Sequence, residues 1–301
     1  MNIIYAFRRT VFYPQHTGSG TELPSGDVRV PFLRKVKEMG FEGLELGVPS
    51  GSEREIRDQG QELKDAGLPC IAVRGGGPVL HPRSLSGNRE RMAAAVRSAS
   101  WIGAEIVNAS IGMPRPSSVT STIPWGESIS WGCSRDAREE DFRRAAEAFR
   151  EVAPLAEDLG VKISIEIHQH CLVDNSWSGR HLMELIDHPS VGLNPDLGNV
   201  YWIYDVPEES CEAAVVAMAP HAHYWHMKNL IRTHIPQHKH AIFLQVPLPD
   251  GDIDYRFSLS AMIAAGYSGP LAIEGLRLGD QIRGDARSVT YIRELLEEIS
   301  G

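Results

Sequence analysis

Short apolar runs and amphipathic segments alternate along the whole chain. The apolar runs are typical of buried strands, and the segments between them have the period of a helix with one apolar face. Eight runs are expected to be strands: 3–7, 43–46, 69–75, 105–110, 161–168, 191–198, 222–229 and 270–275. Eight segments are expected to be helices: 30–40, 53–66, 88–103, 139–160, 178–188, 207–220, 255–265 and 285–299.

This alternation predicts parallel strands joined by crossover helices. A doubly wound open sheet is the main alternative to a closed barrel. The count of eight strands favours the barrel, and no GxGxxG turn supports the open sheet: the three glycines at 75–77 run straight into Pro78. We therefore predict the α/β class, with residues 1–301 forming a single (β/α)₈ TIM barrel. Long insertions are expected after the fourth strand (111–135) and after the seventh (230–255).

Four residues near the ends of the last four predicted strands indicate a metal site: Glu166, Asp196, His226 and Glu274. Their spacing is about 30 residues, with a longer last gap, and roughly 30 residues make one strand–helix unit of such a barrel. Side chains at the carboxyl ends of barrel strands converge on one mouth. Three carboxylates and an imidazole at one point would repel each other unless a divalent cation neutralised them.

Each of the four residues also has an ordinary interpretation when it is considered alone. Glu166 and Glu274 could form buried ion pairs, Asp196 could cap a turn, and His226 could be a core histidine. The barrel spacing of all four favours the metal site. Three oxygen donors and one nitrogen suit Mn²⁺ best, with Mg²⁺ or Zn²⁺ as alternatives. Such a site would accept a substrate that chelates through two adjacent oxygens, and the metal would stabilise a developing enolate.

Further polar and aromatic residues are expected around the same mouth. His168 lies two residues after Glu166, so it should share that side of the strand and could act as the proton-transfer base. Lys228 bears the same relation to His226 and is the second candidate catalytic residue. The candidate substrate-binding residues are His170, Asn199, Arg232, Trp125 and Trp177, although solvation or loop packing could explain each of them.

Composition and charge exclude several classes of protein. The 301 residues carry 39 acidic and 30 basic side chains, for a net charge of −9, and contain no dense basic run, so we expect no nucleic-acid partner. The sequence contains no run of eighteen apolar residues, so we expect no membrane span. The N-terminus is expected to form a first strand and not a signal peptide. The four cysteines are widely separated, which favours reduced thiols and a cytoplasmic location.

The quartet Glu166, Asp196, His226 and Glu274 resembles that of the xylose isomerase-like barrel family, which includes sugar isomerases, epimerases and inosose dehydratases. A narrower resemblance lies in four segments: EIHQHCLVDNSWS, NPDLGNVYWIYDVPEE, YWHMKNLIRTHIP and VPLPDGDIDYRFSLSAMIAAGY. They look like the larger, metal-binding subunit of bacterial C-glycoside deglycosidases.

The narrower resemblance implies an activity and a partner. The implied reaction is β-elimination on a 3-keto C-glycoside: a base removes the proton at sugar C2, and the bond from C1 to the aromatic carbon breaks. A phenolic or flavonoid aglycone is released. The implied partner is a small β-rich subunit in a hetero-oligomer. The related ketose epimerases tend to carry a second Glu and a His where this chain has Leu172 and Asn199, which favours elimination over epimerisation.

Two other functions are kept as alternatives. The first is a metal-dependent sugar or inositol-derivative isomerase, epimerase or dehydratase that works alone. The second is a non-catalytic barrel, stabilised by a metal, that serves as a binding subunit; the open position expected at this site speaks against it. A barrel endonuclease would need more His and Asp ligands and a basic face, and neither is evident.

Overall fold

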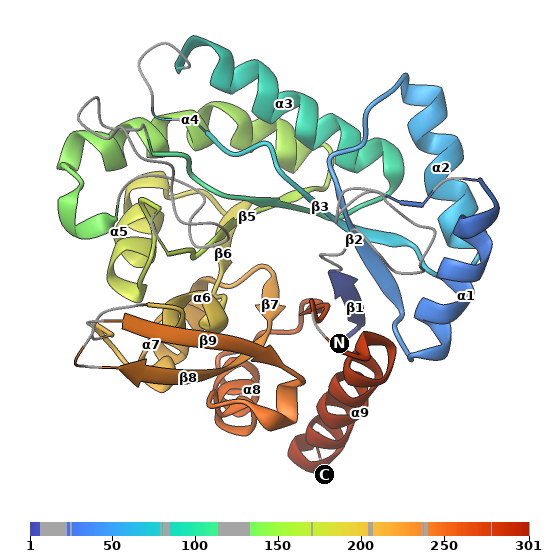
Figure 1. Ribbon diagram of the computed structural model, residues 1–301. Coiled ribbons are helices and arrows are strands. Elements are labelled where there is room, and N and C mark those ends of the chain that lie inside the picture. The colour runs from blue at the N-terminus through green and yellow to red at the C-terminus, as the bar shows by residue number, and fades with distance from the viewer. Residues whose placement is uncertain are drawn as a thin grey trace.

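The computed structural model describes residues 1–6, 23–24, 26–78, 80, 85–113, 133–169, 171–203, 207–235, 237, 240–277 and 279–300. Its central feature is a sheet of eight parallel strands in the order β6-β5-β4-β3-β2-β1-β10-β7 (Figure 1). The strands are β1 Ile3–Ala6, β2 Gly43–Gly47, β3 Cys70–Arg74, β4 Ile106–Ala109, β5 Lys162–Glu166, β6 Val191–Asn194, β7 Trp225–Met227 and β10 Leu271–Glu274.

The two ends of this sheet meet, so the strands form a nearly closed barrel. A single parallel bridge joins Leu193 of β6 to Ala222, just before β7. The His223 N–H donates to the Leu193 carbonyl at 3.0 Å, which extends the same contact. The prediction of a (β/α)₈ barrel is therefore confirmed.

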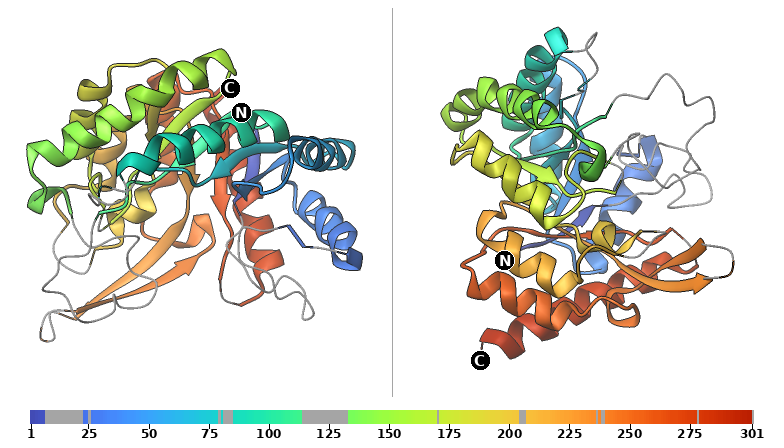
Figure 2. Two further views of the ribbon diagram at one scale, coloured as in Figure 1. Left: turned by 90° about the horizontal axis from the view of Figure 1, so that it is seen from above. Right: turned by 90° about the vertical axis from the view of Figure 1, so that its left-hand side faces the viewer.

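Helices surround the barrel, as the alternating pattern predicts (Figures 1 and 2). They are α1 Arg29–Glu38, α2 Glu53–Asp65, α3 Leu85–Ile102, α4 Glu139–Asp158, α5 Ser176–Ile186, α6 Leu197–Tyr201, α7 Cys211–Met218, α8 Tyr255–Ala264 and α9 Gln281–Ser300. Local sequence sets their ends: α2 begins with a capping box between Ser52 and Glu55, and Gly67 follows it at a positive φ of 71°.

Some predicted boundaries are wrong. The strand expected over 161–168 ends at Glu166, which leaves His168 in the loop, and the one expected over 222–229 shrinks to Trp225–Met227. The strand expected over 191–198 ends at Asn194, before Pro195, because proline has no N–H for the sheet. The short helix α6 then follows at once.

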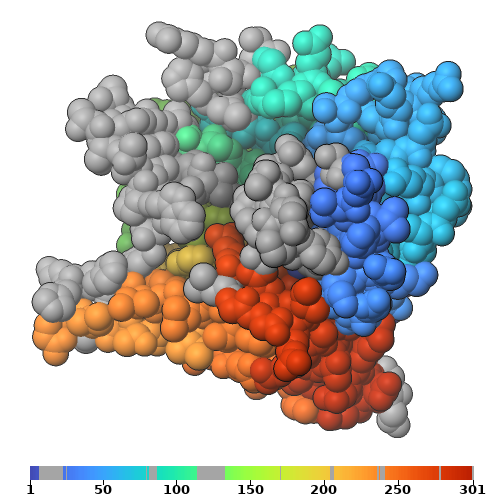
Figure 3. Space-filling model, turned by 45° about the vertical axis from the view of Figure 1, so that its right-hand side comes forward, coloured from blue at the N-terminus to red at the C-terminus, as the bar shows by residue number. Residues whose placement is uncertain are grey.

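The second insertion, 230–255, consists largely of an antiparallel hairpin that the sequence analysis did not predict. Its strands are β8 Asn229–Ile235 and β9 His240–Val246. The hairpin leaves the carboxyl end of β7 and extends away from the barrel (Figure 2), where it forms a ledge in the space-filling view (Figure 3, orange). Most of the first insertion, residues 114–132, lies outside the described residues.

The apolar core has two layers. The larger layer lies between the barrel and its helices, and includes Tyr5, Phe32 and Phe149. A small inner layer fills the barrel with Ile4, Ala6, Ala72, Ile106, Tyr224 and Ala272. In the described residues, no helix is both long and apolar enough to cross a membrane.

Candidate metal centre

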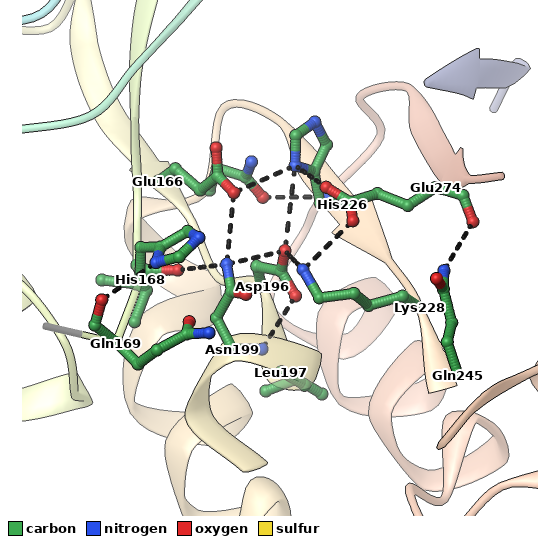
Figure 4. Close-up of polar contacts among 12 residues, drawn as sticks. Glu166, His168, Gln169, Asp196, Leu197, Asn199, His226, Lys228, Gln245 and Glu274 are labelled. Carbon is green, nitrogen blue, oxygen red and sulfur yellow. Dashed lines mark hydrogen bonds and ion pairs between the residues drawn. The ribbon is translucent and has the colours of Figure 1, made fainter. Parts of the chain in front are cut away.

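Glu166, Asp196, His226 and Glu274 come together at the mouth of the barrel. One potential ligand atom from each lies within 4.8 Å of those from all the others. Glu166 and Glu274 end β5 and β10, His226 lies in β7, and Asp196 follows β6. All four side chains are buried and point toward one another (Figure 4). The four residues that the strand spacing predicts to converge therefore form a cluster.

The period of the strands explains this convergence. Side chains two residues apart on a strand point to the same face. Tyr224 and Ala272 belong to the inner layer of the barrel, and His226 and Glu274 follow them by two residues. The same step leads from the buried Ser164 to Glu166. Glu166, His226 and Glu274 are therefore inward-facing residues at or near the carboxyl ends of their strands, and Asp196 joins them from the cap of α6.

The imidazole of His226 is held between two sets of carboxylates. Its Nε2 lies 2.6 Å from Glu45 Oε2, in β2. Its Nδ1 lies 3.3 Å from Glu274 Oε1, 3.5 Å from Glu166 Oε1 and 3.8 Å from Asp196 Oδ2. Nδ1 is buried and makes no hydrogen bond in the structure. A buried nitrogen without a partner needs an explanation, and a cation between Nδ1 and the carboxylates supplies one.

Glu166 is held in place by amides and one guanidinium. Asn108 Nδ2 donates to its Oε2 at 3.0 Å, and Asn199 Nδ2 donates to its Oε1 at 3.2 Å. Arg74 lies 3.5 Å from Oε2. Asn194 extends this network: it donates to Asn108 Oδ1 at 3.1 Å and accepts from the His226 N–H at 2.7 Å. The carboxylate is therefore oriented before any ligand arrives.

Asp196 satisfies both interpretations that the sequence left open. Its Oδ1 accepts from the Asn199 N–H at 3.2 Å, so it caps α6 as a turn-forming aspartate would. Its Oδ2 accepts from Lys228 Nζ at 2.6 Å and faces the cluster. Lys228 also lies 3.2 Å from Glu274 Oε2. The buried ammonium therefore pairs with two of the four ligands.

The charges of the cluster fit a divalent cation. Glu45, Glu166, Asp196 and Glu274 bring four negative charges, and Lys228 and Arg74 bring two positive ones. A buried imbalance of two negative charges is costly, and a divalent ion on a neutral His226 would cancel it. Three carboxylates and one imidazole favour Mn²⁺ or Mg²⁺ over Zn²⁺. The residues present thus fit a divalent metal.

The pKa values of the buried groups at the site depend on burial and on the neighbouring charges. Burial lowers the pKa of His226, but Glu45 and Glu166 outweigh it and raise that pKa to about 9. Burial opposes the charge of Lys228, yet Asp196 and Glu274 raise its pKa. Burial raises the pKa of Asp196 to about 6, and the neighbouring carboxylates add to this effect against Lys228. The raised pKa values of His226 and Lys228 reflect the surrounding carboxylates, whereas Arg74 and His226 outweigh burial and lower the pKa of Glu166.

His168, the predicted base, lies beside Glu166 and Asn199 (Figure 4). Its Nδ1 lies 3.0 Å from the Gln169 carbonyl oxygen, and its side chain is partly buried. Burial lowers the pKa of His168 to about 4, with Glu166 opposing, so the ring is neutral near pH 7. A neutral imidazole can accept a proton. The base role remains a prediction.

The other predicted site residues are less close to the centre. Trp177 lies on α5, is 59% exposed and stacks on His181, so it does not join the cluster. Asn199 donates to Glu166, Asp196 and the Ile167 carbonyl, so it braces the ligands; its contact with a substrate stays a prediction. Arg232 lies on β8, with its guanidinium 5.8 Å from the Phe243 ring centre. Trp125 and His170 lie outside the described residues.

Four bracing residues escaped the sequence analysis: Glu45, Arg74, Asn108 and Asn194. Arg74 and Asn194 end β3 and β6, Asn108 is the last residue but one of β4, and Glu45 lies in the middle of β2. The signal was available, because Arg74 and Asn108 follow the inner-layer residues Ala72 and Ile106 by two positions.

Comparison with known proteins agrees with this fold. Residues 33–295 match the family described as xylose isomerase-like TIM barrel. The L-ribulose-5-phosphate 3-epimerase of Shigella flexneri is 25% identical over 259 residues, which cover 84% of each protein. A xylose isomerase-like TIM barrel protein from Mycobacterium smegmatis, crystallised with magnesium, has a TM-score of 0.78 at 21% identity and aligns over 100% of this chain and 98% of that one.

A third similar structure is the 3-keto-D-glucoside 4-epimerase of E. coli. It has a TM-score of 0.66 at 15% identity, and the alignment covers 98% of this chain and 100% of that one. At such identities the structural likeness supports the fold, and the family match supports the assignment. The chain belongs to the xylose isomerase-like TIM barrel family.

Proposed function

We propose that this protein is a metal-dependent enzyme that moves a proton at the carbon beside the carbonyl of a keto sugar, as a sugar epimerase or isomerase. The buried quartet, with the orphaned Nδ1 of His226 at its centre, carries the proposal. A bound divalent ion would act as a Lewis acid on the substrate oxygens. Similarity to a ribulose-phosphate epimerase and to a keto-glucoside epimerase supports this class of reaction.

The arrangement of the protein's own carboxylates also supports epimerisation. Inverting a carbon requires one group to remove a proton from one face and another to return it to the opposite face. Glu166 and Glu274 lie on opposite sides of the cluster (Figure 4). Leu172 is buried in the core and Asn199 braces the ligands, so neither can carry the proton. The two glutamates are our candidates for this exchange.

Solvent deuterium tests the proposal directly. The Mg²⁺- or Mn²⁺-loaded protein is incubated in D₂O with L-ribulose 5-phosphate, D-fructose or methyl 3-keto-β-D-glucoside. We expect one deuteron to enter the carbon beside the carbonyl of at least one of them, measured by mass spectrometry. The Glu166→Gln variant serves as the blank. No incorporation into any of the three by the metal-loaded protein would contradict the proposal.

A second candidate is the elimination reaction on 3-keto C-glycosides. It shares the first step, removal of the proton at C2. The C1–aryl bond then breaks, its electron pair leaves on the aryl carbon, and that carbon takes up a proton. Trp202 and Phe243 favour this candidate, because their half-buried rings lie 5.8 Å apart beyond the end of α6 and could hold an aryl group. Buried Trp202 Nε1 has no acceptor in the described structure.

The hairpin orients this aromatic pair toward the mouth. Gln245 donates to the carbonyl oxygens of Glu274 and Gly275, and Phe243 lies two residues away on the same face of β9. Release of a phenolic aglycone from a 3-keto C-glucoside, followed by chromatography, would support elimination. If His168 is its base, His168→Ala should abolish release while metal remains bound. Turnover within a few-fold of wild type would exclude His168.

We also propose a small β-rich partner subunit, which the sequence resemblance implies. The outer face of the hairpin supports it, since Ile231, Ile242 and Leu244 are 38%, 47% and 50% exposed there. Exposed apolar side chains grouped on one face are typical of an interface. Co-expression with a neighbouring small gene and size-exclusion chromatography test this proposal. We expect co-elution that Leu244→Lys disrupts, and separate elution would contradict it.

A further inference from the structure

We infer that Glu45 is a positioning residue, which holds the imidazole of His226 in the tautomer that presents Nδ1 to a divalent cation. Glu45 lies in β2, far along the chain from the four ligands, and neither the spacing argument nor the family comparison points to it. The inference rests on the metal centre of the proposed function and does not depend on which reaction the enzyme catalyses.

The contact geometry assigns the proton of the ring. His226 Nε2 lies 2.6 Å from Glu45 Oε2, and both side chains are almost completely buried. A carboxylate oxygen at this distance requires a hydrogen on Nε2, because two lone pairs would repel each other. Asn108 Nδ2 is also 3.4 Å from Nε2. An amide N–H there would favour a lone pair on Nε2, but this contact is 0.8 Å longer than that with the charged carboxylate, so the carboxylate decides the tautomer.

With Nε2 protonated, the neutral ring has its lone pair on Nδ1. This is the atom that faces Glu166, Asp196 and Glu274 and has no hydrogen-bond partner in the structure. Metal-binding histidines commonly donate their other N–H to a carboxylate, which fixes the ring and strengthens the ligand. Glu45 has the position and chemistry for that role.

Glu45 is itself held by a third side chain. Tyr224 Oη donates to Glu45 Oε2 at 2.8 Å, and the Tyr224 ring meets the His226 ring edge-on, with centres 5.1 Å apart. The backbone N–H of His226 is fixed by Asn194. Tyr224, Glu45 and Asn194 thus restrict the position, the tilt and the protonation of one imidazole.

Metal affinity and ligand spectroscopy test this role without any substrate. Isothermal titration of the full chain with Mn²⁺ should give an affinity roughly 10-fold lower for Glu45→Gln and roughly 100-fold lower for Glu45→Leu, the range typical of outer partners of metal ligands. Pulsed EPR of bound Mn²⁺ should detect the ¹⁴N coupling of one imidazole in the wild type. That coupling should weaken in both variants.

Asp285→Asn is the matched control, because Asp285 is also a buried carboxylate that accepts a tyrosine hydroxyl, from Tyr5 at 2.7 Å. We expect it to lower stability without changing Mn²⁺ affinity. If Glu45→Leu does not fold, Glu45→Gln and Tyr224→Phe carry the test. Wild-type affinity and undiminished ¹⁴N coupling in Glu45→Gln would overturn the inference. Failure of the proposed reaction would appear differently, as a wild type that binds Mn²⁺ but exchanges no deuterium.

Discussion

The two halves of the barrel send different polar side chains to the same mouth. The later half, β5 to β10, supplies Glu166, Asp196, His226 and Glu274, whose ligand atoms converge on one point. The earlier half supplies Glu45, Arg74 and Asn108 from β2, β3 and β4. These three contact the ligands, and they are not part of the four-residue cluster. The later half therefore supplies all four candidate ligands, and the earlier half supplies three of the residues that orient them, beside Asn194 and Asn199 of the later half.

This difference shows how a symmetric fold produces an asymmetric site. Both halves follow the same two-residue period, so strand position alone places a polar group at the mouth. The partner of each group decides its role. Carboxylates that face one another need a cation, whereas a carboxylate that faces an imidazole N–H, or an amide that faces a carboxylate, is already satisfied.

The largest effect should come from removing a ligand in the later half. Glu166→Gln keeps the shape of the side chain but removes a negatively charged metal ligand from the cluster. We expect metal affinity to fall by more than the roughly 100-fold that loss of an outer partner can cause, and deuterium exchange to disappear. Titration calorimetry and the exchange assay measure these changes. Metal binding close to that of wild type would show that Glu166 is not a ligand.

Lys228→Met should reveal the charge imbalance of the cluster. The metal-free protein loses the buried ammonium that pairs with Asp196 and Glu274, which should lower its unfolding free energy by roughly 3 kcal/mol. A bound divalent cation should restore more stability in the variant than in wild type. Thermal melts with and without Mg²⁺ measure both effects. An equal metal-induced shift in the two proteins would contradict this account of Lys228.

Asn108→Ser should test a brace of the earlier half with a milder effect. It removes the amide that donates to Glu166 at 3.0 Å but leaves all four ligands. We expect metal affinity to fall roughly 10-fold, as for other outer partners, with one ion still bound per chain. Calorimetry provides both numbers. If Asn108→Ser lost as much metal affinity as Glu166→Gln, the two halves of the barrel would not differ in their roles at the site.

Asp174 provides a contrast outside the cluster, as a partly buried carboxylate that accepts from the Ser134 N–H and faces no cation in the structure described. Burial raises the pKa of Asp174 to about 6 from a usual 3.8. The raised pKa means that its protonated form favours the folded state, so its contribution is complete below pH 3.8 and lost as pH rises through 6. Between pH 4 and pH 7, the unfolding free energy of Asp174→Asn should therefore rise by about 1 kcal/mol relative to that of wild type, allowing for the partial exposure of the carboxylate.

Urea unfolding of both proteins at the two pH values measures this gain. The comparison between variant and wild type removes the titration of all other groups, which the two proteins share. A difference in unfolding free energy that is the same at pH 4 and pH 7 would show that the Asp174 pKa is not raised.

The sequence predicted the barrel and the quartet because both depend on long-range periodicity. Alternating strands and helices predict the fold, and spacing of about 30 residues places Glu166, Asp196 and His226 on successive units. Boundaries were less predictable. Pro195 ends β6 early, and Asp196 belongs to a helix cap, which the apolar pattern does not reveal.

The bracing residues and the wall of the mouth depend on contacts that the chain order hides. Glu45 is close to His226 only because the curved sheet brings β2 and β7 together, with β1 and β10 between them. Trp177 was expected at the mouth from its type, but its place on α5 turns it toward His181. Phe243 meets Trp202 because an unpredicted hairpin brings them together.

The most direct test of the central claim is the metal content of the purified chain. Calorimetric titration with Mn²⁺, checked by elemental analysis after gel filtration, should give one ion per chain for wild type. Asn108→Ser should also bind one ion with lower affinity, and Glu166→Gln should bind none at the same concentrations. Wild-type protein that binds no divalent ion, or Glu166→Gln that binds one equally well, would contradict a metal centre built by the later half of the barrel.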